Sequence, residues 1–419
     1  MRILFVHQNF PGQYRHLAPD LVRRGHTVHA LGALTKTAMP CPPGVQLLRY
    51  RVERMNTPGV HPLVLDVETK ALRGEACAIA AKAMADRGYV PDLICVHPGW
   101  GEALFLREVW PQARQLHFVE LYYAVQGQDL GFDPEFGPVG LAHRCRIVMK
   151  NAALLQSLAF MDAGVCPTEW QANTVPDQFR PKLTVLHDGI DTVLARPNPG
   201  ARFKATSQAG VALDLGAEDE VLSFVNRNLE PSRGYHRFMR CLPEVLRRRP
   251  NVQVIIVGGN GVSYSPRPAT GTHQQIYLDE MRDAIGDAAL ARVHFVGRVP
   301  HPTLMSLFQV TRAHVYLSYP FVLSWSLLEA MACQAQVIAC DTAPVREVIE
   351  GGRQGVLVDF FDTGRLASAI CECLGRPRND SLHGRAARET VVSRYDLQSI
   401  CLPRQVELVE RVGIQADEL

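Results

Sequence analysis

Short apolar runs, each followed by a turn and then by a helical pattern, recur along this chain and restrict its fold more than any other feature. The first run, Ile3 to His7, predicts a strand, followed by a turn at 11–12, an amphipathic helix over 13–24 and a second strand over 28–31. The runs are apolar throughout instead of alternating with polar residues, which is typical of parallel sheets covered by helices on both faces. The sequence therefore predicts βαβ units and an α/β fold.

Two series of these units predict two domains, in keeping with the length of 419 residues. We also expect strands over 93–96 and 164–166 in the first series, and over 222–225, 254–257, 293–296, 313–317, 336–339 and 355–358 in the second. The stretch 195–204, which carries Pro and Gly, is predicted to link the two series.

We therefore expect domains over 1–195 and 196–396, two Rossmann-like doubly wound parallel sheets that face each other across a cleft. Ligands should lie beyond the carboxyl ends of the strands. An amphipathic helix from Tyr395 to about Val412 is expected around the remaining segment, 397–419; it either caps the second domain or crosses back to the first.

Composition excludes several classes of protein. The formal net charge is +2, from 44 basic and 42 acidic residues, so bulk charge does not point to nucleic acid. The 11 cysteines are scattered and are interpreted as reduced thiols of a cytoplasmic protein. The apolar start of the chain is too short for a signal peptide, and no run of about 18 apolar residues predicts a membrane span.

The segment SWSLLEAMACQAQVIACD (324–341) carries the strongest functional signal. A helix is expected to begin near Ser326 and to run to Cys333. Ser324, Trp325 and Ser326 then lie at its N-terminus, where unpaired N–H groups and the helix dipole favour an anion such as phosphate. Glu329 follows about one turn later and suits two neighbouring ribose hydroxyls, although it could also serve the helix dipole alone.

This segment resembles the nucleotide-sugar site of retaining glycosyltransferase family 4, which has the GT-B fold. The family has a Glu-x7-Glu motif here; its second Glu contacts the donor ribose and matches Glu329. Its first Glu, which contacts the transferred sugar, falls on Phe321, eight positions earlier. The resemblance therefore implies a divergent subfamily in which the sugar is held differently, another residue takes the role of the first Glu, or activity is lost.

Two arginines lie on the predicted strand-to-helix loop in FVNRNLEPSRGYHRFMRCL (224–242). Arg227 and Arg233 suit a diphosphate leaving group, because guanidinium groups bind phosphate oxygens in pairs. The family's loop reads roughly Gly-Arg-Leu-x-x-x-Lys-Gly, so that Arg227 matches its Arg and Arg233 replaces its Lys. Two solvated loop arginines are the alternative interpretation.

Further positions resemble nucleotide-binding loops of the family. Gly258 and Asn260, in VGGNG after a strand, would allow close approach of the backbone to a ligand. Arg298 and Val299 fall in the region whose backbone holds the base. In the N-terminal half, Gly12 lies between the first strand and helix, where it would let donor phosphates or sugar approach. CPTEWQANTVPDQFRPKLTVLHDGID (166–191) matches the signature at the end of the family's first domain.

Residues for the acceptor are sought in the N-terminal half. His97, Trp100 and Glu102 are expected on a loop and helix start beside the cleft, with His97 and Glu102 as candidate catalytic residues and His97 at the place of a sugar-contacting His of the family. The acidic and aromatic stretch 119–136, which includes Glu120, Tyr122, Tyr123 and Asp129, suits carbohydrate binding. A helix with Arg144, Arg146 and Lys150 either contacts anionic lipid headgroups at the inner face of the membrane or is a solvated face.

The expected function is retaining transfer of a sugar from a nucleotide-diphosphate sugar, most simply a UDP- or GDP-sugar, to a carbohydrate, glycolipid or other hydroxyl acceptor. No cofactor and no metal are expected, because Arg227, Arg233 and the helix N-terminus would neutralise the leaving diphosphate. Two other classes stay open: a non-catalytic protein that binds nucleotide sugars, and a GT-B sugar phosphorylase or epimerase.

Overall fold

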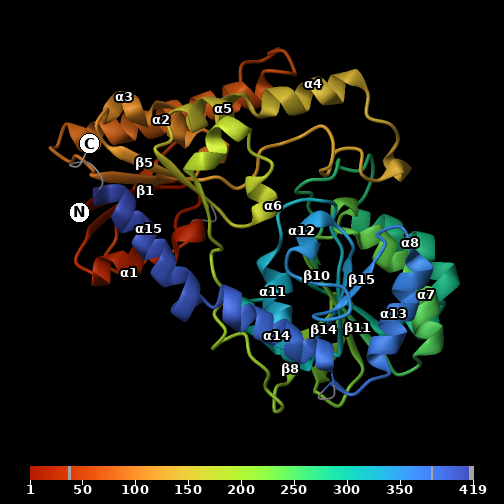
Figure 1. Ribbon diagram of the computed structural model, residues 1–419. Helices are drawn as coiled ribbons and strands as arrows, with labels where there is room; N and C mark the ends of the chain where they lie inside the picture. The colour runs from red at the N-terminus through yellow and green to blue at the C-terminus, as the bar shows by residue number, and fades with distance from the viewer. Residues whose placement is uncertain (36–38, 379–380, 415–419) are drawn as a thin grey trace. The chain divides into compact units, whose positions relative to one another are not determined.

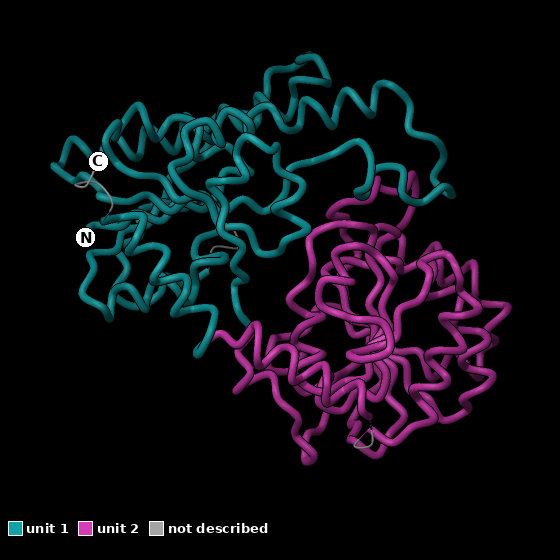
Figure 2. The backbone as a smooth tube through the Cα atoms, in the orientation of Figure 1, with its two compact units in different colours: residues 1–189, 398–419 teal, residues 190–397 magenta. Residues whose placement is uncertain are grey.

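The structure is a computed structural model that describes residues 1–35, 39–378 and 381–414. The chain divides into two compact units (Figures 1 and 2): unit 1 comprises residues 1–189 and 398–419, and unit 2 comprises residues 190–397. The C-terminal segment therefore belongs to the same unit as the N-terminus.

The elements of unit 1 are, in chain order, β1 (Arg2–Val6), η1 (Gly12–Tyr14), α1 (Leu17–Arg23), β2 (Thr27–Ala33), β3 (Gln46–Tyr50), α2 (Leu65–Ala85), β4 (Leu93–Val96), η2 (Pro98–Trp100), η3 (Glu102–Phe105), α3 (Leu106–Val109), β5 (Arg114–Phe118), η4 (Pro134–Phe136), α4 (Leu141–Lys150), α5 (Ala152–Ala159), β6 (Ala163–Cys166), α6 (Glu169–Ala172), η5 (Asp177–Lys182), β7 (Leu183–Val185) and α15 (Leu402–Ile414). Within the described residues, seven strands form one parallel sheet in the order β3-β2-β1-β4-β5-β6-β7.

The elements of unit 2 are β8 (Phe203–Thr206), β9 (Ala212–Leu215), β10 (Val221–Asn228), η6 (Pro231–Arg233), α7 (Tyr235–Arg248), β11 (Gln253–Gly259), α8 (His273–Ile285), α9 (Asp287–Leu290), β12 (Val293–Gly297), α10 (His301–Val310), β13 (Ala313–Tyr316), α11 (Trp325–Ala332), β14 (Gln336–Cys340), α12 (Ala343–Arg346), β15 (Val356–Val358), α13 (Thr363–Leu374) and α14 (Leu382–Tyr395). Over the part of the chain that the structure describes, six strands form a parallel sheet in the order β12-β11-β10-β13-β14-β15.

The two parallel sheets confirm the predicted α/β fold of the GT-B kind. Both strand orders reverse once: the chain moves outward from β1 through β2 to β3 and then returns to β4, and in unit 2 it returns from β12 to β13. The pairs β1–β4 and β10–β13 are therefore the topological switch points, where a crevice beyond the carboxyl ends of the strands takes ligands in sheets of this type.

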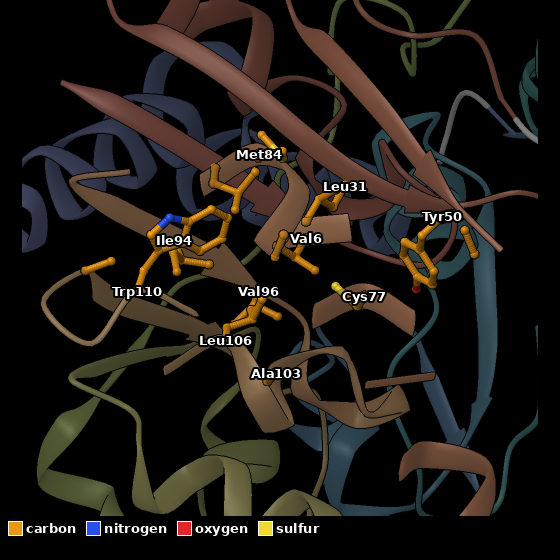
Figure 3. Close-up of a cluster of buried hydrophobic side chains, with 14 residues drawn as sticks. Val6, Leu31, Tyr50, Cys77, Met84, Ile94, Val96, Ala103, Leu106 and Trp110 are labelled. Carbon is orange, nitrogen blue, oxygen red and sulfur yellow. The ribbon is translucent and has the colours of Figure 1, made fainter. Parts of the chain in front are cut away.

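Buried apolar side chains account for the strands. A cluster in unit 1 (Figure 3) brings together Val6, Leu31, Ile94 and Val96 from three neighbouring strands with Cys77 of α2 and side chains of other segments. Each of these strand residues is fully buried, because helices on both sides exclude water from the sheet.

Strand β5 was not predicted, because Gln115 and His117 interrupt its apolar pattern. Both side chains are fully buried and are joined by a hydrogen bond of 3.0 Å between His117 Nε2 and Gln115 Oε1. The antiparallel hairpin β8–β9 was also missed, and its first strand begins inside the stretch predicted as a linker.

The single helix predicted from Tyr395 to about Val412 is wrong. Helix α14 ends at Tyr395, a π-helical turn covers Leu397–Cys401, and α15 follows. The break occurs because Asp396 has extended backbone and pairs with Ile190, while its carboxylate accepts a hydrogen bond from Thr192.

Helix α15 packs within unit 1 against α1 and β5. Glu410 of α15 contacts His26 at 3.0 Å, and the Gln405 amide donates to the carbonyl oxygens of His187 and Asp188 at 3.0 and 3.1 Å. These contacts join the C-terminal helix to the residue before β2 and to the residues after β7.

Candidate functional site

Arg233 lies at the switch point of the sheet in unit 2. It ends the short helix η6, which follows β10, and its Nη1 donates a hydrogen bond to Ser318 Oγ, just after β13, at 3.0 Å. The turn into α7 requires Gly234, which has a φ of 68° and packs so closely that a Cβ would lie 2.2 Å from Leu317 Cβ. The local backbone thus fixes Arg233 where the two strands diverge.

Two aromatic rings flank the Arg233 guanidinium. Its central carbon lies 4.9 Å from the Tyr264 ring centroid and 5.7 Å from that of Phe321, and these two rings are 4.6 Å apart. Phe321 is buried, at 7% exposure. The position that the resemblance gives to a sugar-contacting carboxylate is therefore filled by an apolar ring that contacts the cation through its π face.

Glu230 holds the loop that carries Tyr264, a role that the sequence did not reveal. Its Oε2 accepts hydrogen bonds from the backbone N–H groups of Ser263, Tyr264 and Ser265 at 3.0 to 3.1 Å. The Glu230 side chain is 1% exposed, and three N–H donors stabilise its charge where water cannot. These hydrogen bonds hold the loop whose Tyr264 ring lies beside Arg233.

The glycine-rich strand end is shaped by packing inside the protein. A Cβ on Gly258 would lie 2.7 Å from Leu229, and one on Gly259 would lie 2.8 Å from Arg298 Nε. Arg298 itself donates to Asn228 Oδ1 at 2.9 Å, which joins the end of β12 to the end of β10. Asn260 is exposed and Val299 is half-buried.

Arg227, on the end of β10, is exposed and has no hydrogen-bond or ion-pair partner among the described residues. The structure therefore gives the two predicted arginines different settings: Arg233 is held, and Arg227 extends into solvent.

Helix α11 begins one residue earlier than predicted, at Trp325. Ser324 is its N-cap: the Ser324 hydroxyl accepts a hydrogen bond from Ser326 N at 3.3 Å and lies 2.7 Å from Ser326 Oγ. Tyr316, the last residue of β13, accepts a hydrogen bond from Ser324 N at 3.1 Å. The predicted helix N-terminus is thus placed directly beyond β13, at the same switch point as Arg233.

Glu329 is buried, at 8% exposure, and has a partner that sequence reasoning missed. Its Oε1 accepts a hydrogen bond of 2.7 Å from Nε2 of His301, the first residue of α10. Since His301 lies 28 positions earlier, no local pattern signals the pair.

In unit 1, His97 lies at the switch point after β4. It is 2% exposed, its ring stacks on Trp100 at 3.8 Å between centroids, and its Nδ1 accepts a hydrogen bond from Gly99 N at 3.2 Å. Glu120 is its nearest carboxylate, with 3.7 Å between His97 Nε2 and Glu120 Oε2.

Gly12 and Glu102 have packing roles that the sequence did not suggest. Gly12 has a φ of 49°, and a Cβ there would come within 2.4 Å of the His7 ring. Glu102 is fully buried, its Oε1 accepts a hydrogen bond from the Tyr50 hydroxyl at 2.7 Å, and burial raises its pKa. A carboxyl enclosed in this way is shielded from solvent.

Other predicted acceptor-side residues lie on or beside α4, which has no buried residue. The Lys150 ammonium lies 3.5 Å from the centroid of the Tyr123 ring, and burial lowers its pKa. Arg144 and Arg146 are exposed. In the described ranges, no helix combines the length and the hydropathy required to cross a membrane.

Family models match both halves of the chain. Residues 24–195 match the glycosyl transferase family 4 group, and residues 219–376 match glycosyl transferases group 1.

Curated relatives agree with these matches. Glycogen synthase of Mycobacterium tuberculosis is 28% identical over 233 residues, which are 55% of this chain and 50% of that protein. Phosphatidyl-myo-inositol mannosyltransferase of Mycolicibacterium smegmatis is 31% identical over 206 residues, 47% of each chain. The chain thus spans about half the length of these relatives.

Solved structures share the fold over nearly the whole chain. Sucrose-phosphate synthase from Thermosynechococcus elongatus has a TM-score of 0.71 at 19% identity and covers 98% of this chain and 99% of its own. Anabaena HepE in complex with UDP-glucose has a TM-score of 0.65 at 17% identity with the same coverage. The chain therefore has the GT-B fold, and its two halves are similar to glycosyltransferase domains of the family 4 group and of group 1.

Proposed function

We propose that this protein transfers a sugar from a UDP- or GDP-sugar to a hydroxyl acceptor, with retention of configuration and without a metal ion. One observation carries the proposal: Arg233 is held at the switch point of unit 2 by Ser318 and two aromatic rings, beside the N-terminus of α11. A fixed cation and a helix N-terminus at the carboxyl ends of β10 and β13 suit the diphosphate of a nucleotide sugar.

Each residue of this site then has a role. Arg233 and Arg227 stabilise the charge that develops on the diphosphate, Arg233 from a preorganised position and Arg227 by moving from solvent onto the phosphates. Glu329 accepts hydrogen bonds from the ribose hydroxyls, and its contact with His301 orients the carboxylate. The backbone near Gly258, Asn260, Arg298 and Val299 contacts the nucleoside, and the N–H groups at 324–326 contact phosphate.

Retention follows from a front-face route. The bond between the anomeric carbon and the phosphate oxygen breaks, the acceptor oxygen bonds to the same face, and the acceptor proton passes to the departing phosphate oxygen. This route requires no carboxylate base, which makes it compatible with Phe321 at the site.

We expect the product to keep the anomeric configuration of the donor. NMR of the purified product reads the anomeric proton coupling directly. An inverted product would disprove the retaining mechanism while leaving the assignment of the donor site intact.

The acceptor is proposed to be a carbohydrate or a glycolipid that binds in unit 1, near His97 and Glu120. A glycolipid would bring the exposed Arg144 and Arg146 of α4 to an anionic surface. We leave Glu102 out of the substrate-contacting group because it is buried against Tyr50.

The donor site is tested by thermal unfolding with UDP, GDP, ADP and their common sugar conjugates, with and without Mg²⁺. A nucleotide at about a hundred times its dissociation constant should add roughly 2.7 kcal/mol to the free energy of unfolding. We expect one nucleotide to stabilise the protein regardless of Mg²⁺, and Arg227→Ala to weaken that stabilisation. Absence of stabilisation by every nucleotide would refute the proposed donor site.

A non-catalytic nucleotide-sugar-binding protein is the second candidate, favoured by one observation, the buried Phe321 in the position of a carboxylate. It would bind the same nucleotide but release none of it from the nucleotide sugar. Turnover of the stabilising donor, followed as free nucleotide over hours, separates the two candidates.

A further inference from the structure

Two histidines meet at the switch point of the sheet in unit 1. His7 directly follows β1 and His97 directly follows β4, and the two side chains belong to residues that are 3% and 2% exposed. Their rings lie edge to face, 5.6 Å apart, and Trp100 contacts both: it stacks on His97 at 3.8 Å and meets His7 edge-on at 4.8 Å. The cluster occupies the place where a sheet of this topology binds ligands.

Backbone hydrogen bonds set the tautomer of both rings. Nδ1 of His7 accepts from Asn9 N at 3.0 Å, and Nδ1 of His97 accepts from Gly99 N at 3.2 Å. A neutral imidazole whose Nδ1 accepts must carry its proton on Nε2. Burial, with a smaller contribution from His97, lowers the pKa of His7 to about 3, so that this ring is neutral at neutral pH.

Neither Nε2–H group has a hydrogen-bond acceptor within the described parts of the chain. A side-chain contact with Gln13 raises the pKa of His7 against the effect of burial, but this contact falls outside hydrogen-bond geometry, and neither His7 Nε2 nor Gln13 Oε1 has a geometric partner among the described residues. Glu120 Oε2, at 3.7 Å from His97 Nε2, is too distant for a hydrogen bond. A buried donor without an acceptor is destabilising, so two at one switch point call for an acceptor from outside the chain.

The surroundings distinguish a hydroxyl from a phosphate. The Glu120 carboxylate, whose side chain is 37% exposed, places negative charge beside the His97 donor and disfavours an anion. A hydroxyl group can accept from an imidazole N–H and donate to the carboxylate at the same time. A neutral polyol therefore satisfies all three groups, whereas phosphate satisfies only the donors.

We propose that His7 is a second ligand-binding imidazole, which with His97 donates hydrogen bonds to hydroxyl oxygens of a neutral carbohydrate in the crevice between β1 and β4. The proposal rests on the proposed function, in which unit 1 takes a carbohydrate acceptor, and it adds His7 as a residue that determines binding there. It also assigns Gly12 a purpose: only glycine lets the loop close on the His7 ring.

The test is long-range ¹H–¹⁵N NMR of the full-length protein labelled at histidine. The spectrum of the free protein should show both rings as Nε2–H tautomers. Titration with methyl α-glucoside, methyl α-mannoside and myo-inositol should then shift the Nε2 resonances of His7 and His97. His117, whose Nε2 is bonded to Gln115 within the core, is the internal control and should not respond. Inorganic phosphate should shift neither ring.

Two variants test the N–H hydrogen-bond donor of His7. His7→Phe keeps a ring but removes the N–H, and we expect it to weaken the response of His97 to the sugar at least several-fold. His7→Gln keeps an N–H donor and should restore part of it. Since the spectra of the wild-type protein test the proposal by themselves, a variant that fails to fold does not remove the test.

A response to phosphate without one to sugars, or no response of His7 to any of these probes, overturns the proposal. Thermal unfolding with nucleotides, which tests the donor site of unit 2, separates the proposed function from the proposed role of His7. Nucleotide binding without a sugar response at His7 refutes the role of His7 alone; a sugar response without nucleotide binding refutes the transferase and leaves the carbohydrate site.

Discussion

Replacing Arg233 with alanine should lower kcat/KM for sugar transfer roughly 10²- to 10³-fold, the loss expected when one preorganised donor to a developing anion is removed. Ser318 and the rings of Tyr264 and Phe321 hold the guanidinium before substrate binds, so little reorganisation is needed in the transition state. The loss should lie mostly in kcat. The measurement is the initial rate of nucleotide release from the donor identified in the thermal panel, with the acceptor present.

Several variants control for this result. Arg233→Lys keeps the charge but loses the planar contacts with both rings, and we expect an intermediate rate. Arg202→Ala removes an arginine of the same unit that pairs with Asp214 and Glu218 at the surface, and it should leave the rate unchanged. An Arg233→Ala rate within a factor of about two of wild type would contradict the role of this residue in stabilising the leaving diphosphate.

Acidification should destabilise the protein steeply between about pH 6.5 and pH 4, because several histidines are buried in the neutral form. Burial lowers the pKa of His7, His117 and His314 from 6.5 to about 3 and that of His187 to about 4. In this interval the unfolded chain binds a proton at each site and the folded chain does not, so the free energy of unfolding falls as the pH falls through 6.5 and continues to fall to about 3.

Each of these histidines contributes about 1.4 kcal/mol per pH unit, which is large against a total stability of about 5–15 kcal/mol. His7, His117 and His187 belong to unit 1, whereas His314 and His294, whose pKa burial also lowers, belong to unit 2, so unit 1 should lose the larger amount of stability per pH unit. Hydrogen exchange of backbone amides, measured during urea unfolding at a series of pH values, gives the free energy of unfolding of each unit separately.

His314→Asn is the matched variant for this prediction. The Asn side chain can keep a hydrogen bond to Ser223, which lies 2.9 Å from His314 Nδ1, but it does not titrate. The dependence of the free energy of unfolding of unit 2 on pH should then weaken by the contribution of about one proton, while that of unit 1 stays the same. Stability that stays constant from neutral pH to about pH 5 would show that these imidazoles are not held neutral in the folded state.

Much of the candidate donor site could be predicted from local sequence. The start of α11, just after its N-cap Ser324, and the glycine-bearing strand end lie close to where the pattern of strand, turn and helix places them, whereas Arg227 belongs to the end of β10 and Arg233 to η6 instead of a loop. These positions depend on the few residues around them, because caps, turns and strand ends are local structures. Their roles in binding a nucleotide sugar stay predictions until the variants are measured.

Partners from distant elements could not be predicted in this way. Glu230 holds residues 33 to 35 positions away, Arg233 bonds to a residue 85 positions away, and Glu329 meets His301 across 28 positions. The burial of Glu102 could not be predicted for the same reason. A carboxyl after a strand suggested a catalytic role, and only its contact with Tyr50, 52 positions away, shows that it is buried.

The sequence by itself determined the class of the fold, because runs of apolar residues without alternation can be buried only in parallel sheets with both faces covered. It also determined which loops carry chemistry, since glycine, arginine and capping serine act over a few positions. Tertiary structure alone decided which strands are neighbours, and therefore that His7 meets His97 at one switch point and Arg233 meets Ser318 at the other. The physical reason is that strand order is set by the packing of whole elements, and no residue near either histidine encodes which strand will lie beside it.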